Sequence, residues 1–201
     1  MCSSDLQPSY QRTPFHMEHF PERLAQAKKY ADLLKGAGIE RGLIGPREAD
    51  RIWERHILNC LPVSTLMAKG AKVLDIGSGA GLPGVVIALA RPDLQVTLLE
   101  PLQRRVDFLN EVVATLKVPN LSVHRGKAER ESGQYDYVTA RAVAPLSKLW
   151  ELSKHLIKPG GSLLAMKGEA AQAEAADVKG AKLHEISLEG LPLARIVEVK
   201  H

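Results

Sequence analysis

The chain has 201 residues, of which 45% are hydrophobic and 25% charged, the proportions of an ordinary soluble globular protein. This length allows one α/β core with a small extension, and the composition excludes a collagenous, repetitive or wholly disordered chain. The formal net charge of +4 favours an anionic partner such as nucleic acid, although many basic proteins of this size bind none.

Cysteine usage and hydropathy indicate the compartment. Cys2 and Cys60 lie far apart, with neither the spacing of a disulfide framework nor that of a zinc site. No apolar run approaches the roughly 20 residues that span a bilayer. The N-terminus has no charged region followed by an apolar stretch, so no signal peptide is expected. We therefore expect a cytoplasmic protein that has no metal and no membrane segment.

Three parts are expected along the chain. Residues 1–14 are polar without periodicity and are expected to be a disordered or non-native tail. Residues 15–68 are expected to form a helical extension. Apolar residues recur there at helical spacing between residues 24 and 34, and Gly36 with Gly38 is expected to end this first helix. Pro46 suits the start of a second helix, which continues to Cys60.

The third part, residues 69–201, is expected to be an α/β core, because short aliphatic runs alternate with amphipathic segments. A turn is expected at the Pro-Gly-Gly of residues 159–161. Strands alternating with helices predict a mostly parallel, doubly wound sheet. The predicted strands are residues 72–76, 95–100, 121–124, 135–140 and 162–166, with a closing pair at 183–188 and 194–199, and the predicted helices are residues 85–90, 104–116, 146–156 and 169–178.

A glycine-rich segment, DIGSGAGLPG at residues 75–84, follows the first predicted strand and opens the first core helix. That context is what gives such a motif meaning. Gly77, Gly79 and Gly81 alternate along it, as glycines do where the backbone turns sharply and a ligand touches main-chain atoms. The segment therefore predicts a cofactor-binding loop.

Two ligand classes compete for this loop. Gly79, Gly81 and Gly84 fit the G-x-G-x-x-G fingerprint of dinucleotide-binding proteins. Against that reading, the Asp75 carboxylate would repel a pyrophosphate, whereas it suits the cationic amino group of S-adenosylmethionine. Glu100, which ends the second predicted strand, is placed to accept hydrogen bonds from ribose hydroxyls and serves both readings. The acid before the glycines favours a methyltransferase.

Beyond the loop, the chain resembles the bacterial RsmG (GidB) family of 16S ribosomal RNA guanine-N7 methyltransferases. The resemblance runs from about Phe20 to the end of the chain. The glycine loop alone is shared by many methyltransferases, but its Leu-Pro-Gly ending together with the other segments is far more specific. These segments are WERHILNC at residues 53–60, RGKAE at 125–129, ARAVA at 140–144 and MKG at 166–168.

The resemblance implies a Rossmann-like class I methyltransferase fold with an N-terminal helical extension, S-adenosylmethionine as cofactor and a guanine of the small ribosomal subunit as substrate. The residues agree in part with the implied cofactor contacts. Ala128 and Glu129 follow the third predicted strand, where an adenine ring is flanked in such folds, and Arg141 ends the fourth, in the crevice where open α/β sheets bind ligands. The implied contacts are Gly77, Leu82, Ala128, Glu129 and Arg141.

Methylation of guanine N7 requires little from the protein, because N7 already has a free in-plane lone pair. No general base and no covalent nucleophile are required, and Cys60 is expected to be a packing residue. An arginine directly over N7 would oppose the reaction, since the product ring is cationic. Arg141 is therefore expected to act by positioning, on a phosphate, the base O6 or a cofactor group.

Basic residues near predicted strand ends are candidates for RNA contacts, and Arg105 belongs with them as part of a phosphate-binding rim. Arg55 and His56 are neighbours on a predicted helix and are expected to point in different directions. Trp53 and Trp150 are expected to be buried anchors, and aromatic residues at 4% do not support a base-stacking platform. We expect a monomer that binds 16S rRNA or the small subunit. The RNA-binding candidates are Arg55, His56, Arg104, Arg125, Lys127 and Lys167.

Other functions remain open at the level of the sequence. A methyltransferase for another RNA, a protein or a small molecule shares the same loop. An NAD-type oxidoreductase is disfavoured by Asp75 and by the absence of an obvious hydride-transfer pair. A non-catalytic nucleic-acid-binding module is disfavoured by the intact glycine loop.

Overall fold

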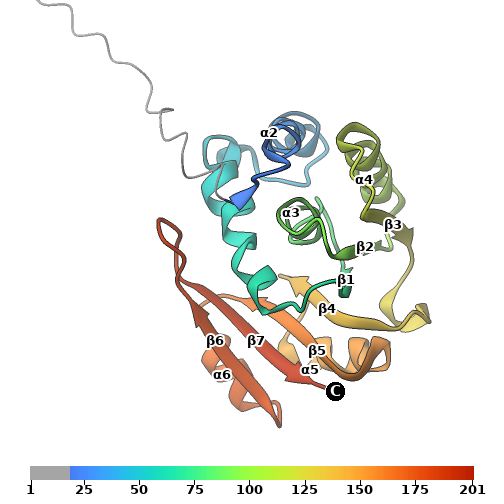
Figure 1. Cartoon of the computed structure of the whole chain (residues 1–201), viewed down its shortest axis with the longest axis vertical. Helices are drawn as coiled ribbons and strands as arrows, with labels where there is room; N and C mark the ends of the chain where they lie inside the picture. The colour runs from blue at the N-terminus through green and yellow to red at the C-terminus, as the bar shows by residue number, and fades with distance from the viewer. Residues whose placement is uncertain (1–18) are drawn as a thin grey trace, which may run out of the picture.

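The computed structural model describes residues 19–201, so the tail expected at residues 1–14, and Cys2 with it, lies outside the described residues. Seven strands form one sheet in the order β3-β2-β1-β4-β5-β7-β6 (Figure 1). Strands β1 to β5 are parallel, and β7 runs antiparallel to both β5 and β6. The predicted mostly parallel sheet is confirmed. The strands are β1 Lys72–Ile76, β2 Gln95–Glu100, β3 Leu121–Arg125, β4 Tyr135–Arg141, β5 Ile157–Lys167, β6 Ala181–Ile186 and β7 Ala194–Lys200.

Helices cover both faces of the sheet, as expected for a doubly wound fold (Figure 1). On one face, α3 (Gly84–Ala90) and α4 (Gln103–Leu116) share an apolar cluster with the N-terminal segment. On the other face, α5 (Leu146–Ser153) and α6 (Ala171–Ala176) form a second cluster with the strands. The central strands are buried on both sides, which explains their continuous aliphatic sequences.

The segment before β1 is helical but irregular. Helix α2 (Leu24–Leu33) continues as a π-helical turn through Gly38, so the expectation that Gly36 and Gly38 end the helix is wrong. A glycine costs a helix only about 1 kcal/mol, and Gly38 is buried against Ile44. After Pro46 come a 3-10 turn, the π-helical turn Ile52–Ile57 and two further 3-10 turns.

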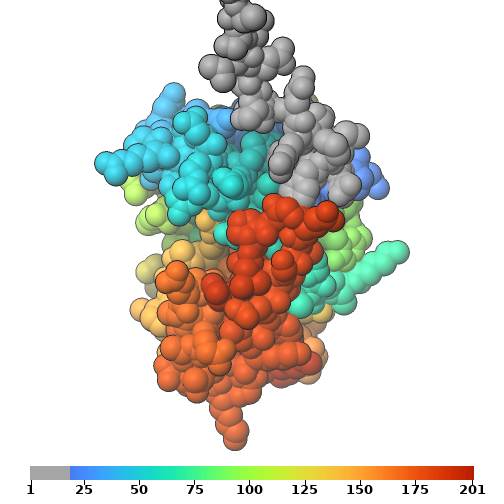
Figure 2. Space-filling model, turned by 90° about the vertical axis from the view of Figure 1, so that its left-hand side faces the viewer, coloured from blue at the N-terminus to red at the C-terminus, as the bar shows by residue number. Residues whose placement is uncertain are grey.

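This segment packs into the same apolar cluster as α3 and α4. In Figure 2 it lies directly above the C-terminal hairpin of β6 and β7. The division into a helical extension at 15–68 and a core at 69–201 stays a prediction. Among residues 19–201, no helix is long and apolar enough to cross a membrane.

The C-terminal part of the sheet differs in one detail from the expectation. The Pro-Gly-Gly turn expected at residues 159–161 lies inside β5, which begins at Ile157. Gly160 has a φ of +81°, and its N–H donates to the carbonyl of His201, so the chain end holds this irregular stretch in the sheet. The register of β4 against β5 shifts at the same place.

The strand order fixes where a ligand binds. β1 lies between β2 and β4, so the connections leave it in opposite directions, and the loops after these strands open a crevice at their carboxyl ends. Asp75, Glu100 and Arg141 all belong to these strand ends.

Candidate active site

The glycine loop joins β1 to α3 at the centre of the sheet. Gly77, Gly79 and Gly81 have φ values of +65°, +58° and +96°, which glycine adopts without a steric penalty. Leu82 and Gly81 are buried, while Gly77 and Gly79 are partly exposed. The exposed part of the loop is therefore main chain, as a site for a ligand that touches the backbone requires.

Asp75 lies beneath this loop and is fully buried. Its Oδ2 accepts the N–H of Gly84 at 3.0 Å, the first residue of α3. Its Oδ1 is buried without a hydrogen-bond partner among the described residues. Burial raises the pKa of Asp75 to about 7, against the opposing effect of the Gly84 N–H. An unsatisfied buried carboxylate oxygen fits a cationic ligand group.

Glu100 closes the other side of the loop. Its Oε2 accepts the N–H of Gly79 at 3.0 Å, and its Oε1 accepts the N–H of Leu102 at 3.0 Å. Arg105 lies 3.7 Å from the same Oε2. The side chain is 1% exposed, so Glu100 orders the loop, and ribose hydroxyls would use its remaining lone pairs. Its assignment as a ribose ligand stays a prediction.

The segment after β3 lies beside Glu100. The Gly126 N–H donates to the Glu100 carbonyl at 3.2 Å, and the 3-10 turn Ala128–Arg130 follows. Ala128 is buried and Glu129 is exposed. This places the predicted adenine-flanking pair at the carboxyl ends of β2 and β3.

Arg141 connects the end of β4 to the helical segment. Its Nη1 donates to the Cys60 Sγ at 3.2 Å and to the His56 carbonyl at 3.4 Å. Its Nη2 lies 3.3 Å from His56 Nδ1 and 3.5 Å from the Arg55 carbonyl. Cys60 is fully buried, in agreement with a packing role, and burial raises the pKa of its thiol.

Arg55 and His56 converge on Glu48, so the expectation that they point in different directions is wrong. Arg55 contacts Glu48 Oε1 at 2.8 Å and His56 Nε2 lies 3.1 Å from Oε2. One carboxylate holds both because the segment is a π-helical turn packed beside the preceding 3-10 turn. Their assignment as RNA ligands stays a prediction.

The side chain of Lys167 is only 10% exposed, whereas a lysine that contacts RNA has to reach the surface. Its Nζ donates to the Ala144 carbonyl at 2.7 Å and lies 2.7 Å from Glu174 Oε2. The same carboxylate oxygen accepts the Leu146 N–H at the start of α5. Lys167 therefore anchors the segment after β4, and a direct RNA contact stays a prediction.

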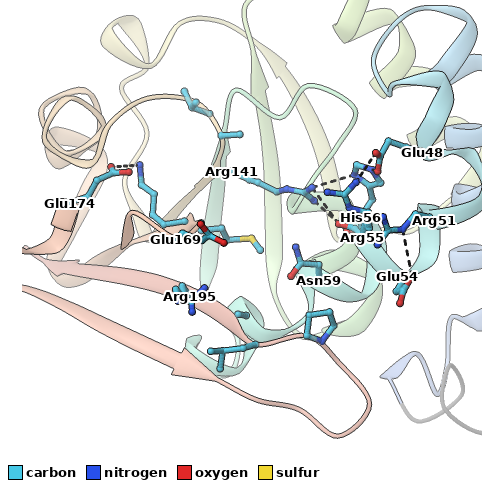
Figure 3. Close-up of a pocket in the computed structure, with 18 of the residues that line it drawn as sticks. Glu48, Arg51, Glu54, Arg55, His56, Asn59, Arg141, Glu169, Glu174 and Arg195 are labelled. Atoms are coloured by element: carbon cyan, nitrogen blue, oxygen red, sulfur yellow. Dashed lines mark hydrogen bonds and ion pairs between the residues drawn. The ribbon is translucent and has the colours of Figure 1, made fainter. Parts of the chain in front are cut away.

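A pocket of about 1120 Å³ opens between these elements (Figure 3). Its walls are the helical segment, the loop after β4, the end of β5 and the start of β7. Val143, on its rim, lies close to the glycine loop, because a Cβ at Gly77 would come 3.0 Å from Val143 Cγ2. The lining includes Glu48, Arg55, His56, Asn59, Arg141, Val143, Met166, Lys167, Glu169 and Leu193.

The other basic candidates lie elsewhere. Arg104, Arg125 and Lys127 are exposed. Arg125 and Lys127 line a second hollow of about 420 Å³ together with Arg130. In the sheet order β3 is four strands from β5, or about 19 Å, so Lys167 and Arg125 do not share one short rim. The predicted rim is divided into two places.

Two residues that support the site, Tyr30 and Glu48, are not among those predicted from the sequence. The Tyr30 hydroxyl donates to the Ala80 carbonyl at 2.8 Å and supports the glycine loop from the helical segment. Its position between Ala27 and Ala31 on the predicted apolar face was an available signal. Glu48 has no local signal, because its role depends on the fold of the residues after it. Within the described part of the chain, no group of three or more His, Cys, Asp or Glu is placed to hold a metal ion.

Solved structures share this fold. The precorrin-6y C5,15-methyltransferase of Geobacter metallireducens superposes with a TM-score of 0.55 at 12% identity, covering 80% of this chain and 91% of that one. A SAM-dependent methyltransferase from Aquifex aeolicus gives a TM-score of 0.55 at 16% identity, covering 77% and 97%. At these identities the likeness concerns the fold alone, and it confirms the Rossmann-like class.

Sequence relatives are much closer. The ribosomal RNA small subunit methyltransferase G of Thermobifida fusca is 53% identical over 184 residues, 90% of this chain and 76% of the relative. The protein of the same name from Mycolicibacterium gilvum is 53% identical over 162 residues, covering 78% and 71%. The sequence model of the GidB family, described as rRNA small subunit methyltransferase G, matches residues 23–192. This chain therefore belongs to the GidB family of small-subunit rRNA methyltransferases.

Proposed function

We propose that this protein transfers a methyl group from S-adenosylmethionine to N7 of a guanine in 16S ribosomal RNA. Family membership supports methyl transfer to small-subunit rRNA. The observation that carries the cofactor assignment is the buried Oδ1 of Asp75, which lies beneath the positive-φ glycines and has no hydrogen-bond partner within residues 19–201. A pyrophosphate placed there would meet an acidic group, whereas a cation finds a partner.

The residues that would hold the cofactor surround this loop. Backbone groups of the loop suit the amino-acid part of the cofactor, Glu100 the ribose, and the turn after β3 the adenine. Arg141 has no carboxylate partner among the described residues and suits an anionic group. The proposed cofactor residues are Asp75, Gly77, Gly79, Gly81, Leu82, Glu100, Ala128, Glu129 and Arg141.

The proposed chemistry needs positioning more than acid–base groups. Bound S-adenosylmethionine supplies an electrophilic methyl group on a positively charged sulfur. The protein has to hold the N7 lone pair in line with that group and exclude water. Val143, Met166 and Leu193 give the pocket an apolar part suited to an extruded base. We propose no general base and no covalent nucleophile.

RNA phosphates are proposed to lie along the exposed basic residues near the second hollow. The Arg104→Ala/Arg125→Ala double variant should weaken RNA binding. It should also make the slope of log affinity against log salt shallower by about 1 to 2, because RNA binding with fewer phosphate contacts releases fewer counterions. Affinity is measured at several salt concentrations. Lys179→Ala/Lys182→Ala, which removes two exposed charges near β6, is the matched control. An unchanged slope in the Arg104/Arg125 variant contradicts this RNA surface.

The function itself is tested with labelled S-adenosylmethionine and small ribosomal subunits that lack the modification. We expect label in 16S RNA and one site of strand cleavage selective for N7-methylguanine. Naked 16S RNA, tested in parallel, separates free RNA from the assembled subunit as substrate. Cofactor binding without label in either would refute the ribosomal substrate, and label without selective cleavage would refute N7.

We further propose that the protein acts as a monomer in the cytoplasm.

A further inference from the structure

Arg141 is unusual among the arginines around the pocket. Within the described part of the chain, the polar contacts of its guanidinium nitrogens, at 3.2 to 3.5 Å, go to neutral atoms: two backbone carbonyls, the Cys60 sulfur and an imidazole nitrogen. Arg55, by contrast, is paired with Glu48. The guanidinium of Arg141 is therefore held in place while its charge stays uncompensated by a carboxylate among the described residues. That arrangement suits a group that must meet an anion from the cofactor or the RNA.

The histidine contact specifies a tautomer. A guanidinium only donates hydrogen bonds, so His56 Nδ1 must present its lone pair to Arg141 Nη2, 3.3 Å away. The neutral ring then has its proton on Nε2, which donates to Glu48 Oε2 at 3.1 Å. Glu48 thus selects the one tautomer that can accept from Arg141 (Figure 3). A doubly protonated ring would point an N–H at the guanidinium.

We propose that His56 and Glu48 are positioning residues for Arg141, and that protonation of His56 releases the guanidinium from its place in the pocket. The inference rests on the proposed function only in the assumption that Arg141 meets an anionic group of the cofactor or the RNA. It gives a role to the connected side chains of Glu48, His56 and Arg141, which link the helical segment to the end of β4.

The charges around His56 agree with a neutral ring. Burial lowers the pKa of His56, Arg141 and Arg55 lower it further, and Glu48 raises it. Arg51 also acts on the Glu48 carboxylate from the 3-10 turn, and the Cys60 thiol contacts Arg141 Nη1. The net direction is downward, so the surroundings of His56 favour the neutral ring, which is the form that the contacts with Arg141 and Glu48 require.

A first test does not depend on activity. Nitrogen NMR of the full chain without cofactor reports the tautomer and the titration of His56. We expect the Nε2–H tautomer and a pKa below that of free histidine. Glu48→Gln should lower this pKa by about one pH unit, and Arg141→Met should raise it. Glu54→Gln, which removes an exposed carboxylate from the same pocket rim, should leave it unchanged. An Nδ1–H tautomer, or a titration indifferent to Glu48 and Arg141, overturns the proposal.

A second test asks whether His56 acts through Arg141. His56→Gln should lower kcat/KM for methyl transfer about tenfold in the wild-type background and have little further effect in Arg141→Met. Equal losses in both backgrounds would show that His56 acts independently and would overturn the proposal. Circular dichroism of each variant separates loss of positioning from loss of fold. If no RNA substrate is found, the NMR test still shows whether Glu48 and His56 position Arg141. Failure of the proposed function can therefore be told apart from failure of this inference.

Discussion

Replacing Asp75 by asparagine is expected to stabilise the cofactor-free protein and to weaken its binding of S-adenosylmethionine. The carboxylate is fully buried, and one of its oxygens has no partner among the described residues. Burial raises the pKa of Asp75 to about 7. Above this pH the folded state contains a buried negative charge, which destabilises it. Asparagine removes that charge while its carbonyl oxygen still accepts the Gly84 N–H.

The sign of the pH dependence follows from the raised pKa. Between the ordinary aspartate range and about pH 7, the folded state binds more protons at Asp75 than the unfolded chain does. The contribution of Asp75 therefore lowers the free energy of unfolding as pH rises through this window, and the full penalty is present above pH 7. Asparagine should abolish this dependence and raise the free energy of unfolding at pH 8 by about 2 kcal/mol, since its unpaired N–H group offsets part of the gain.

Cofactor binding should change in the opposite direction. A cationic ligand group needs the ionised carboxylate, so the wild-type affinity for S-adenosylmethionine should fall as pH drops from 7.5 to 5.5, while Asp75→Asn should bind about 10- to 100-fold more weakly at pH 7.5. Calorimetry in buffers of different ionisation enthalpy should detect a proton released on binding to the wild type and none for the variant.

Asp93 provides a control of opposite sign. It accepts two hydrogen bonds from Arg91 and one from the Gly70 N–H, and the Arg91 guanidinium holds the pKa of Asp93 well below its usual range. Asp93→Asn should therefore lower stability and leave cofactor affinity unchanged. If Asp75→Asn destabilised the protein as Asp93→Asn does, Asp75 would be a structural acid and its assignment to the cofactor would lose its support.

The core could be predicted from the sequence because its signals are local. Each central strand is a short aliphatic run, and the glycine loop stands between a strand and a helix, so β1, β2 and the loop lie where their sequences indicate. Residues 46–60 carry apolar residues at helical spacing, but with residues 34–38 and 62–66 they fold into π-helical and 3-10 turns. Spacing alone does not distinguish these from an α-helix, since packing against the loop and α3 decides their geometry.

The site could be predicted only where strand ends bring residues together. Asp75, Glu100 and Arg141 end adjacent parallel strands, and that follows from topology. The link from Arg141 to His56 joins residues 85 positions apart, and its partner Glu48 belongs to an irregular turn. The position of Lys167 at a strand end is predictable from the sequence. Its hydrogen bond to the Ala144 carbonyl and its ion pair with Glu174 are not.

Two glycines of the loop should respond differently to the same substitution. Gly84→Ala is expected to lower the free energy of unfolding by about 3 kcal/mol, because a Cβ there would meet the Leu98 side chain and lie 2.7 Å from Asp75 Oδ2 in the buried core. Neither neighbour is free to move, since Asp75 is bound to the Gly84 N–H and both side chains are fully buried.

Gly79→Ala should instead affect the ligand. Its φ of +58° costs a residue with a Cβ about 1 kcal/mol, but the nearest atom to that Cβ is the Gly77 carbonyl oxygen at 3.8 Å. The added methyl group faces the open side of the loop, where we place the cofactor, so affinity for S-adenosylmethionine should fall more than about tenfold while the fold persists. Denaturant unfolding without cofactor and cofactor titration of both variants measure the two effects separately. Normal affinity in Gly79→Ala would place the ligand away from this loop. Normal stability in Gly84→Ala would mean that β2 and α3 move apart to make room for the methyl group more easily than their packing indicates.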